Sequence, residues 1–293
     1  MPIAYGEDVI YLAWEGNDES LYVASSTDGK SFNEKHELTN ERSLKSTRPA
    51  VVYAKGLLFL AWIDHNDLVN IISSPDGLNW ANKFTVSETS HRKAAPTLAF
   101  ANDRLYLAWT GRDRKNHVNI TSFNVAADGE LAEYTKTTVG EESSEDAGPA
   151  LTGTSDRLYL AWIGRDDHLN VLESHDGRTF ENKRTLKDSS PHTATPGLIY
   201  GDGFFYLSWI GHDDKLNLIT STDAITWSNK ITLNEKSTGT GVAGLAYGNG
   251  TLFLDWSGID HKHHINILSF DVSAAGGVLP EGQKVTLEEE EQK

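Results

Sequence analysis

Residues 158–162 read LYLAW, and closely similar phrases occur at six places along the chain. Their tryptophans are separated by 48, 47, 53, 47 and 47 residues. Internal repeats with a period of about 40 to 50 residues are typical of propellers and other repeat arrays. The chain is therefore built from six copies of one structural unit. The six phrases are IYLAW at 10–14, LFLAW at 58–62, LYLAW at 105–109 and 158–162, FYLSW at 205–209 and LFLDW at 252–256.

One complete unit, residues 149–186, shows what is repeated. It contains four runs rich in apolar, β-branched or aromatic residues, PALTGT, RLYLAWIG, HLNVLES and TFENKRTL. Turn-forming residues separate the runs at 154–156, 164–167 and 175–177. Short strands separated by such turns predict a four-stranded antiparallel meander. No window shows a sustained helical period, so we expect almost no helix.

The second run of each unit is apolar at successive positions. Successive strand residues point to opposite faces, so this strand is predicted to be buried on both faces. Blades packed side by side around a ring provide that burial. One column of the repeat is always leucine, at Leu12, Leu60, Leu107, Leu160, Leu207 and Leu254. The column before it is always aromatic, at Tyr11, Phe59, Tyr106, Tyr159, Tyr206 and Phe253.

We therefore predict an all-β fold, a six-bladed β-propeller of four-stranded antiparallel blades. Blades 1–3 match blades 4–6 at intervals of 147 or 148 residues, which indicates duplicated three-blade halves. The chain starts on a first strand and ends on a fourth, which allows the ring to close without a shared strand. We expect one domain over 1–287 and an acidic C-terminal tail at 288–293. The expected blades are approximately 1–47, 48–94, 95–147, 148–194, 195–241 and 242–287.

The turn after the third strand carries a second repeated phrase in four blades. Each copy begins with serine. The four copies are STDGKSF at 26–32, SPDGLNW at 74–80, SHDGRTF at 174–180 and STDAITW at 221–227. We expect the Asp and Ser side chains to bond the turn backbone and the aromatic ring to plug the blade. The pattern resembles the Asp-box of sialidase-like propellers, although one residue is missing between the Asp and the aromatic. That resemblance implies a propeller architecture.

Sialidase activity does not follow from the resemblance. The sialidase-type enzymes grip a carboxylate with three arginines from several blades. In this chain the last arginine is Arg184, so blades 5 and 6 contain none. A clamp of bidentate arginines around the centre is therefore difficult to build.

The composition narrows the classes of partner. The 293 residues include 42 acidic and 26 basic residues, giving a formal charge of −16, which repels nucleic acid and anionic lipid. There is no cysteine, which excludes disulfides and thiolate sites. We find no signal peptide and no apolar run of about 18 residues, so we expect no membrane insertion. A cytoplasmic location and export by a non-classical route both remain open.

The second hairpins are polar and repetitive, and each contains at least one Asp. Seven of the eleven histidines are in these hairpins, at His65, His117, His168, His212, His261, His263 and His264. Asn then recurs at one register of the third strand in five blades, with Tyr22 in its place in blade 1. Asn is depleted in strands, so it needs a hydrogen-bonding reason. It either fixes the hairpin backbone or binds sugar hydroxyls.

Two further alternatives stay open at this stage. The repeated tryptophans either pack between blades or offer a flat apolar face to a ligand ring. Asp255 occupies a column that is otherwise alanine or serine, where a buried carboxylate is costly unless it is paired. It marks either an adaptation to ring closure or one special site between blades 5, 6 and 1. The dense run 260–264 contains no complete ligand set, so we predict no metal and no cofactor.

We predict a carbohydrate-binding, lectin-like propeller with repeated sites on the face formed by the second hairpins and the linkers. Polar hairpins that recur around a ring suit multivalent glycan binding better than catalysis. One alternative is a glycoside hydrolase-like enzyme that pairs Asp255 with Glu88, Glu142 or Glu235 in a central site. Another is a protein-interaction scaffold that uses the acidic rim. The predicted ligand-binding residues are Trp62, Trp109, Trp162, Trp209, Trp256, Asp166, Asp213, Asp255, Asp260, Asn70, Asn119, Asn170, Asn217 and Asn266.

Overall fold

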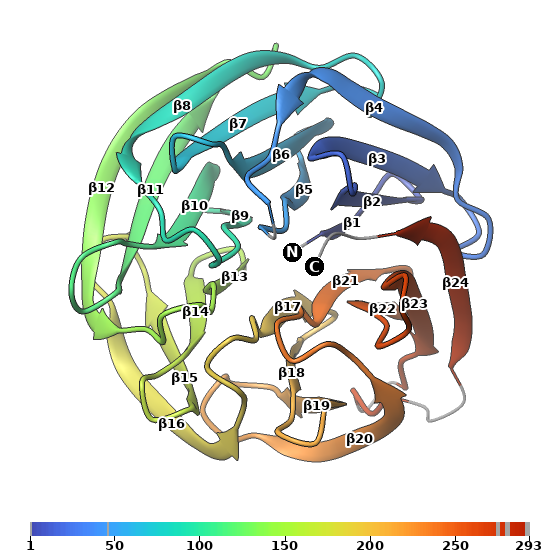
Figure 1. The fold of residues 1–293 in the computed structure, drawn as a ribbon. Helices are drawn as coiled ribbons and strands as arrows, with labels where there is room; N and C mark the ends of the chain where they lie inside the picture. The colour runs from blue at the N-terminus through green and yellow to red at the C-terminus, as the bar shows by residue number, and fades with distance from the viewer. Residues whose placement is uncertain (1, 46, 274–275, 279–281, 291–293) are drawn as a thin grey trace.

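The structure, a computed structural model, describes residues 2–45, 47–273, 276–278 and 282–290, with all side chains except those of 33, 34, 134, 289 and 290. In this part of the chain 24 strands form six sheets around a central axis (Figure 1). The all-β, six-bladed propeller predicted from the sequence is confirmed.

The strands follow the repeat. Those of blades 1 to 3 are β1 (Ile3–Gly6), β2 (Val9–Glu15), β3 (Ser20–Ser26), β4 (Asn33–Arg42), β5 (Ala50–Ala54), β6 (Leu57–Ile63), β7 (Leu68–Ser74), β8 (Ala81–Thr89), β9 (Thr97–Ala101), β10 (Arg104–Thr110), β11 (His117–Val125) and β12 (Leu131–Glu142). Those of blades 4 to 6 are β13 (Ala150–Gly153), β14 (Leu158–Ile163), β15 (His168–Ser174), β16 (Glu181–Ser189), β17 (Gly197–Gly201), β18 (Phe204–Ile210), β19 (Lys215–Ser221), β20 (Ser228–Lys236), β21 (Gly244–Gly248), β22 (Thr251–Ser257), β23 (His264–Asp271) and β24 (Gln283–Glu290).

Each blade is an antiparallel meander of four consecutive strands, with the first strand innermost and the fourth at the rim (Figure 1). The ring closes between blades 6 and 1 without a shared strand in the described residues. Side chains make this junction: the ring of Tyr5 stacks on that of Phe253, 6.2 Å between centroids. Asn249 Nδ2 also donates to Asp8 Oδ1 at 2.7 Å.

The end of blade 6 differs from the expected boundary at 287. Strand β24 runs through Glu290, where its backbone pairs with His264. Residues 288–290 are therefore part of the sheet, because the ladder with β23 continues past Leu287. Residues 291–293 of the predicted tail lie outside the described residues.

The core lies between neighbouring blades. All seven residues of β6 are buried, as the pattern of the second strand predicts. One apolar cluster joins Val23 of blade 1 to Leu60 and Trp62 of blade 2. Full burial of a large apolar side chain stabilises a fold by roughly 1.5–3 kcal/mol. Blade-to-blade packing of this kind therefore holds the ring together.

The four Ser-Asp turns, at 26–32, 74–80, 174–180 and 221–227, have the predicted local structure. In the first, Ser26 Oγ donates to Asp28 Oδ1 at 2.9 Å, and the backbone N–H groups of Lys30 and Ser31 donate to the same oxygen at 2.8 Å. Gly29 adopts a left-handed φ of 68°, which favours glycine. The turns are thus closed by their own side chains.

Backbone hydrogen bonds stabilise the ionised form of the carboxylates in these turns. The bond from the N–H of the residue three positions later lowers the pKa of Asp28, Asp176 and Asp223, and the equivalent bond from Asn79 lowers the pKa of Asp76 to about 2. The four turns therefore need ionised Asp side chains for their full stability.

Candidate functional site

Alternate turns of each blade lie on opposite faces of the ring. The second hairpins, at 16–19, 64–67, 111–116, 164–167, 211–214 and 258–263, share one face with the linkers that join the blades, and we call it the linker face. Each linker begins with a fully buried serine, at Ser43, Ser90, Ser143, Ser190 and Ser237. The N–H of this serine donates to a hairpin carbonyl; Ser190, for example, bonds Asp167 O at 2.9 Å. The linkers and hairpins therefore form one fixed surface.

The repeated asparagines lie beneath this surface and their amides are engaged within the protein. In each of the five blades the Asn Nδ2 donates to the carbonyl two residues earlier at 2.9 to 3.3 Å. A threonine of the fourth strand donates to its Oδ1 at 2.6 or 2.7 Å. The amide thus joins the hairpin to the rim strand. The buried amides therefore have a structural role, and the predicted contacts between these asparagines and sugar hydroxyls are corrected. The asparagines are Asn70, Asn119, Asn170, Asn217 and Asn266.

The repeated tryptophans also lie beneath the surface. All six indoles are at most 1% exposed. Trp62 packs within an apolar cluster shared by blades 1 and 2, and its Nε1 donates to Arg42 O at 3.1 Å. A ring so covered offers no face to a ligand. The prediction that Trp62, Trp109, Trp162, Trp209 and Trp256 stack on a sugar is therefore corrected: they pack between the blades.

The predicted hairpin carboxylates of Asp166, Asp213 and Asp260, in contrast, face solvent. The side chain of Asp166 is 68% exposed, and its Oδ1 accepts one backbone N–H, from His168, at 3.2 Å. Asp213 has the equivalent bond from Lys215 at 3.2 Å. Burial raises the pKa of Asp260, but backbone bonds from His264 and Lys262 and the charge of His264 lower it overall. These three carboxylates retain acceptor positions for a ligand, and their predicted role stays a prediction.

A lysine on the rim strand of each of blades 2 to 6 joins the blade to its predecessor. Lys284 Nζ in β24 lies 2.6 Å from Glu235 in β20, and Lys83 Nζ in β8 lies 2.5 Å from Glu41 in β4. The remaining pairs are Lys136–Glu88, Lys183–Glu141 and Lys230–Asp188. An ammonium and a carboxylate therefore lie together at five successive junctions between blades.

The same lysines lie over the buried tryptophans. The Nζ atom is 5.1 to 5.4 Å from the indole centroid for Lys83 over Trp62, Lys183 over Trp162, Lys230 over Trp209 and Lys284 over Trp256. The indole face attracts the cation and holds it in place. These lysines were not among the residues predicted from the sequence, although the dipeptide Asn-Lys repeats at 82–83, 182–183 and 229–230.

A cavity of about 330 Å³ opens in the cleft between blades 5 and 6. Its polar wall contains Lys284, Glu235 and Asp260, and its apolar wall contains Ile259, which is 59% exposed. Trp256 and Asn266 also line this cavity, although both side chains are buried and the Asn266 amide is hydrogen-bonded within the protein. The structure thus brings together three of the predicted residues, Trp256, Asp260 and Asn266, around a lysine–carboxylate pair.

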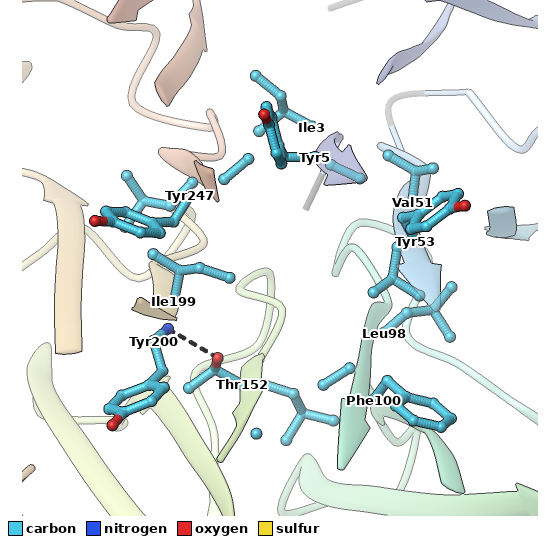
Figure 2. Close-up of a pocket in the computed structure, with 17 residues that line it drawn as sticks. Ile3, Tyr5, Val51, Tyr53, Leu98, Phe100, Thr152, Ile199, Tyr200 and Tyr247 are labelled. Atoms are coloured by element: carbon cyan, nitrogen blue, oxygen red, sulfur yellow. Dashed lines mark hydrogen bonds between the residues drawn. The ribbon is translucent and has the colours of Figure 1, made fainter. Parts of the chain in front are cut away.

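The central channel offers a different environment. A cavity of about 160 Å³ is lined by the innermost strands of all six blades. Figure 2 shows the rings of Tyr53, Phe100, Tyr200 and Tyr247 directed away from the middle of the channel, with Ile199 pointing inward. All 17 lining residues are uncharged, and none is acidic. This channel therefore lacks the carboxylates that a central hydrolytic site needs.

The carboxylates proposed for a central site lie apart in the fold. Asp255 is buried on β22 beside Gly244, whose Cα would not accept a methyl group because the Asp255 Oδ1 atom occupies that space. Glu88 and Glu142 belong to blades 2 and 3, and they pair with Lys136 and with Lys115 and Arg165. Glu235 pairs with Lys284 at the rim. Glu88, Glu142 and Glu235 lie on the rim strands β8, β12 and β20, whereas Asp255 is buried on the second strand of blade 6, and the grouping of Asp255 with these acids stays a prediction.

Asp255 likewise lies outside the inter-blade cavity that contains Asp260. The histidine-rich hairpin is held by carboxylates: Asp260 Oδ1 lies 2.9 Å from His264 Nδ1. Searching the residues that the structure describes, we find no group of three or more His, Cys, Asp or Glu side chains placed to hold a metal ion. Over the same residues, no helix is long and apolar enough to cross a membrane.

Comparison with known proteins places the fold among lectin propellers. SapL1 lectin, solved with alpha methyl fucoside, matches with a TM-score of 0.71 over 98% of this chain and 95% of its own, at 9% identity. A fungal lectin from Aleuria aurantia, described as a six-bladed β-propeller with a novel fucose recognition mode, matches with a TM-score of 0.67 over 96% and 95%, also at 9% identity. The chain has the fold of these lectins.

An enzyme shares part of the same architecture. The GH43 endo-arabinanase from Bacillus licheniformis matches with a TM-score of 0.52 and 13% identity, covering 80% of this chain and 97% of its own. No protein-family model and no curated protein matches the sequence. Function must therefore be argued from the site itself.

Proposed function

We propose that the protein is a carbohydrate-binding, lectin-like propeller that holds sugars in the clefts between its blades, at the rim of the linker face. The observation that carries the proposal is the repeated lysine–carboxylate pair that bridges neighbouring blades. One example is the cleft between blades 5 and 6, with Lys284, Glu235 and Asp260 around about 330 Å³.

The chemistry of this cavity suits a sugar. The Lys284 ammonium donates hydrogen bonds, while the carboxylates of Glu235 and Asp260 accept them. Adjacent hydroxyls of a sugar ring both donate and accept, and bonds to charged groups are roughly twice as strong as neutral ones. The exposed side chain of Ile259 provides apolar contact for the C–H face of the ring. The exposed hairpin carboxylates Asp166 and Asp213 are proposed to bind sugars at the equivalent junctions, Asp166 between blades 3 and 4 and Asp213 between blades 4 and 5.

Repetition gives the proposal a functional reason. Several weak sites on one rigid ring gain avidity on a multivalent glycan. The net charge of −16 disfavours nucleic acid as a competing partner. The hydrogen bonds of the four Ser-Asp turns also support a relation to Asp-box propellers of the sialidase type, which we include in the proposal as architecture alone.

A glycan array followed by titration calorimetry tests the function. Because two neighbours are described with fucose or a fucoside, alpha methyl fucoside is the first soluble probe. We expect millimolar to micromolar binding at more than one site per chain. The variant Lys284→Met removes one donor and is expected to lower the number of sites by one. Lys187→Met, an exposed lysine on β16 outside the described cavities, is the matched control. Failure to bind any arrayed glycan, or turnover of a chromogenic glycoside, contradicts the proposal.

A further inference from the structure

The cleft between blades 1 and 2 is longer than the site described above. A cavity of about 620 Å³ runs between rim strand β4 and the segment 78–83 of blade 2. Six consecutive residues of β4, His36–Glu41, line one wall. Its volume is nearly twice the 330 Å³ of the cleft between blades 5 and 6.

One end of this groove carries the same pair as the other clefts. Lys83 and Glu41, 2.5 Å apart, both line it. The groove therefore contains one of the proposed sugar sites and continues from it along the outer wall of the ring, towards the face that carries the Ser-Asp turns.

The far end is apolar and rigid. Leu78 is 42% exposed, and Trp80 beside it is partly buried. The Trp80 Nε1 donates to Gly77 O at 2.9 Å, which fixes the ring. Asp76 accepts the backbone N–H groups of Leu78 and Asn79 at 2.9 and 2.8 Å, which fixes the turn. A preorganised aromatic and aliphatic surface loses little entropy when a ligand covers it.

Three polar side chains lie between the two ends. His36, Thr39 and Asn40 line the groove, and none makes a side-chain hydrogen bond to another residue that the structure describes. Glu37 is already engaged, since Ser20 Oγ donates to its Oε1 at 3.0 Å. The middle of the groove thus offers amide, hydroxyl and imidazole groups.

We propose that this groove binds a neutral oligosaccharide of two or more units rather than a single sugar. One unit sits at Lys83 and Glu41, and a later unit covers Trp80 and Leu78. The ammonium of Lys83 is paired with the Glu41 carboxylate, and among the described residues that line the groove there is no second Lys or Arg to attract an anionic ligand. The inference rests on the proposed function and names the length and charge of the glycan at that site.

The two ends of the groove, but not its middle, have counterparts in the duplicated half 147 positions later. Ile225, 48% exposed, replaces Leu78, and Trp227 replaces Trp80. Lys230 and Asp188 replace Lys83 and Glu41 and lie 2.5 Å apart. Blades 2 and 5 are three places apart in a ring of six, so these two sets of residues lie on opposite sides of the ring. The corresponding turns of blades 1 and 4 carry Lys30 and Arg178, with phenylalanines in place of the tryptophans.

The test compares glycans of increasing length. Methyl glycosides and di-, tri- and tetrasaccharides with the same terminal sugar, fucosylated ones included, are titrated into the full chain by calorimetry. We expect affinity to rise with length. The double variant Leu78→Asn, Ile225→Asn changes exposed side chains and is expected to lower trisaccharide affinity about tenfold while leaving the methyl glycoside unchanged. Trp80→Ala is expected to do the same in blade 2.

The outcomes separate the two proposals. Binding of the methyl glycoside with no gain from added units, or with no effect of the double variant on the trisaccharide, overturns the inference and leaves the lectin function standing. Loss of binding to all glycans overturns both. Stronger binding of sulfated or carboxylated oligosaccharides than of neutral ones overturns the assigned ligand class. Because Leu78→Asn and Ile225→Asn alter surface positions, the test does not depend on the folding of the Trp80→Ala variant.

Discussion

Arg48 and Ser257 are joined across the closure of the ring: the guanidinium Nη2 lies 2.6 Å from the Ser257 Oγ, although 209 positions separate them in sequence. Arg48 comes from the linker between blades 1 and 2, and Ser257 ends β22 of blade 6. The contact therefore spans blade 1 and helps to fix the junction at which no strand is shared.

Removal of this contact is expected to weaken ring closure. A hydrogen bond to a charged group contributes about 1.5–3 kcal/mol, so Arg48→Ala is expected to lower the free energy of unfolding by an amount in that range. Urea denaturation measures the change. Arg184→Ala, which removes a partly buried arginine bonded to the Lys183 carbonyl, is the control. Equal stability of the two variants contradicts the closure role.

Loss of the hydrogen bonds made by the repeated asparagines is expected to lower the free energy of unfolding rather than the affinity for glycans. Thr185→Val removes the donor to Asn170 Oδ1 and leaves a buried acceptor unpaired, at a cost of about 1–3 kcal/mol. Thr185→Ser keeps the hydroxyl and is expected to restore most of the loss. Thermal and urea unfolding give the stabilities, and glycan titration gives the affinity. A large loss of affinity in a stable Thr185→Val protein argues instead for a direct role of this column in the site.

Substitutions in the lysine–carboxylate pairs of the rim strands are expected to lower the affinity for glycans rather than the free energy of unfolding. Lys284 and Glu235 are partly exposed, and exposed ion pairs contribute about 0–1 kcal/mol. Glu235→Gln is thus expected to change the unfolding free energy by less than about 1 kcal/mol while it weakens binding in the cleft between blades 5 and 6. Calorimetry beside urea denaturation checks both. A marked loss of stability with unchanged glycan affinity means that the pair is structural.

Acid is expected to loosen the Ser-Asp turns in a defined window. The folded pKa of Asp76, about 2, lies below the usual value near 3.8, so its contribution is complete above about pH 4 and is lost as the pH falls towards 2. Asp76→Asn is expected to flatten the loss of stability between pH 4 and 2, with Asp213→Asn as the control for removing one exposed carboxylate. Parallel pH curves for wild type and Asp76→Asn contradict this prediction.

The sequence was sufficient to predict the architecture because the same pattern of residues occurs six times. Six leucines and six aromatics at one register require a strand buried on both faces, and a closed ring satisfies that requirement. The Ser-Asp turns were also predictable, because their hydrogen bonds run between neighbours in sequence, as from Ser31 N to Asp28.

The site was only partly predictable. Asp260, Trp256 and Asn266 line one cavity, but the Trp256 and Asn266 side chains are buried, and the ligand-binding role of Asp260 stays a prediction. The lysines were missed because their partners come from the preceding blade: Lys284 and Glu235 are 49 positions apart. Nothing within a single repeat shows that a rim lysine and a rim carboxylate meet.

The sequence by itself determined the number of blades, the strands of each blade and the residues that fill the core. These depend on hydrophobic periodicity and turn chemistry, which are local and repeated. The tertiary structure alone decided which polar side chains remain available. Burial and hydrogen bonding are set by contacts between blades. The repeated tryptophans and asparagines are therefore buried and have structural roles. The clefts at the rim, where one blade ends and the next begins, became the candidate sites.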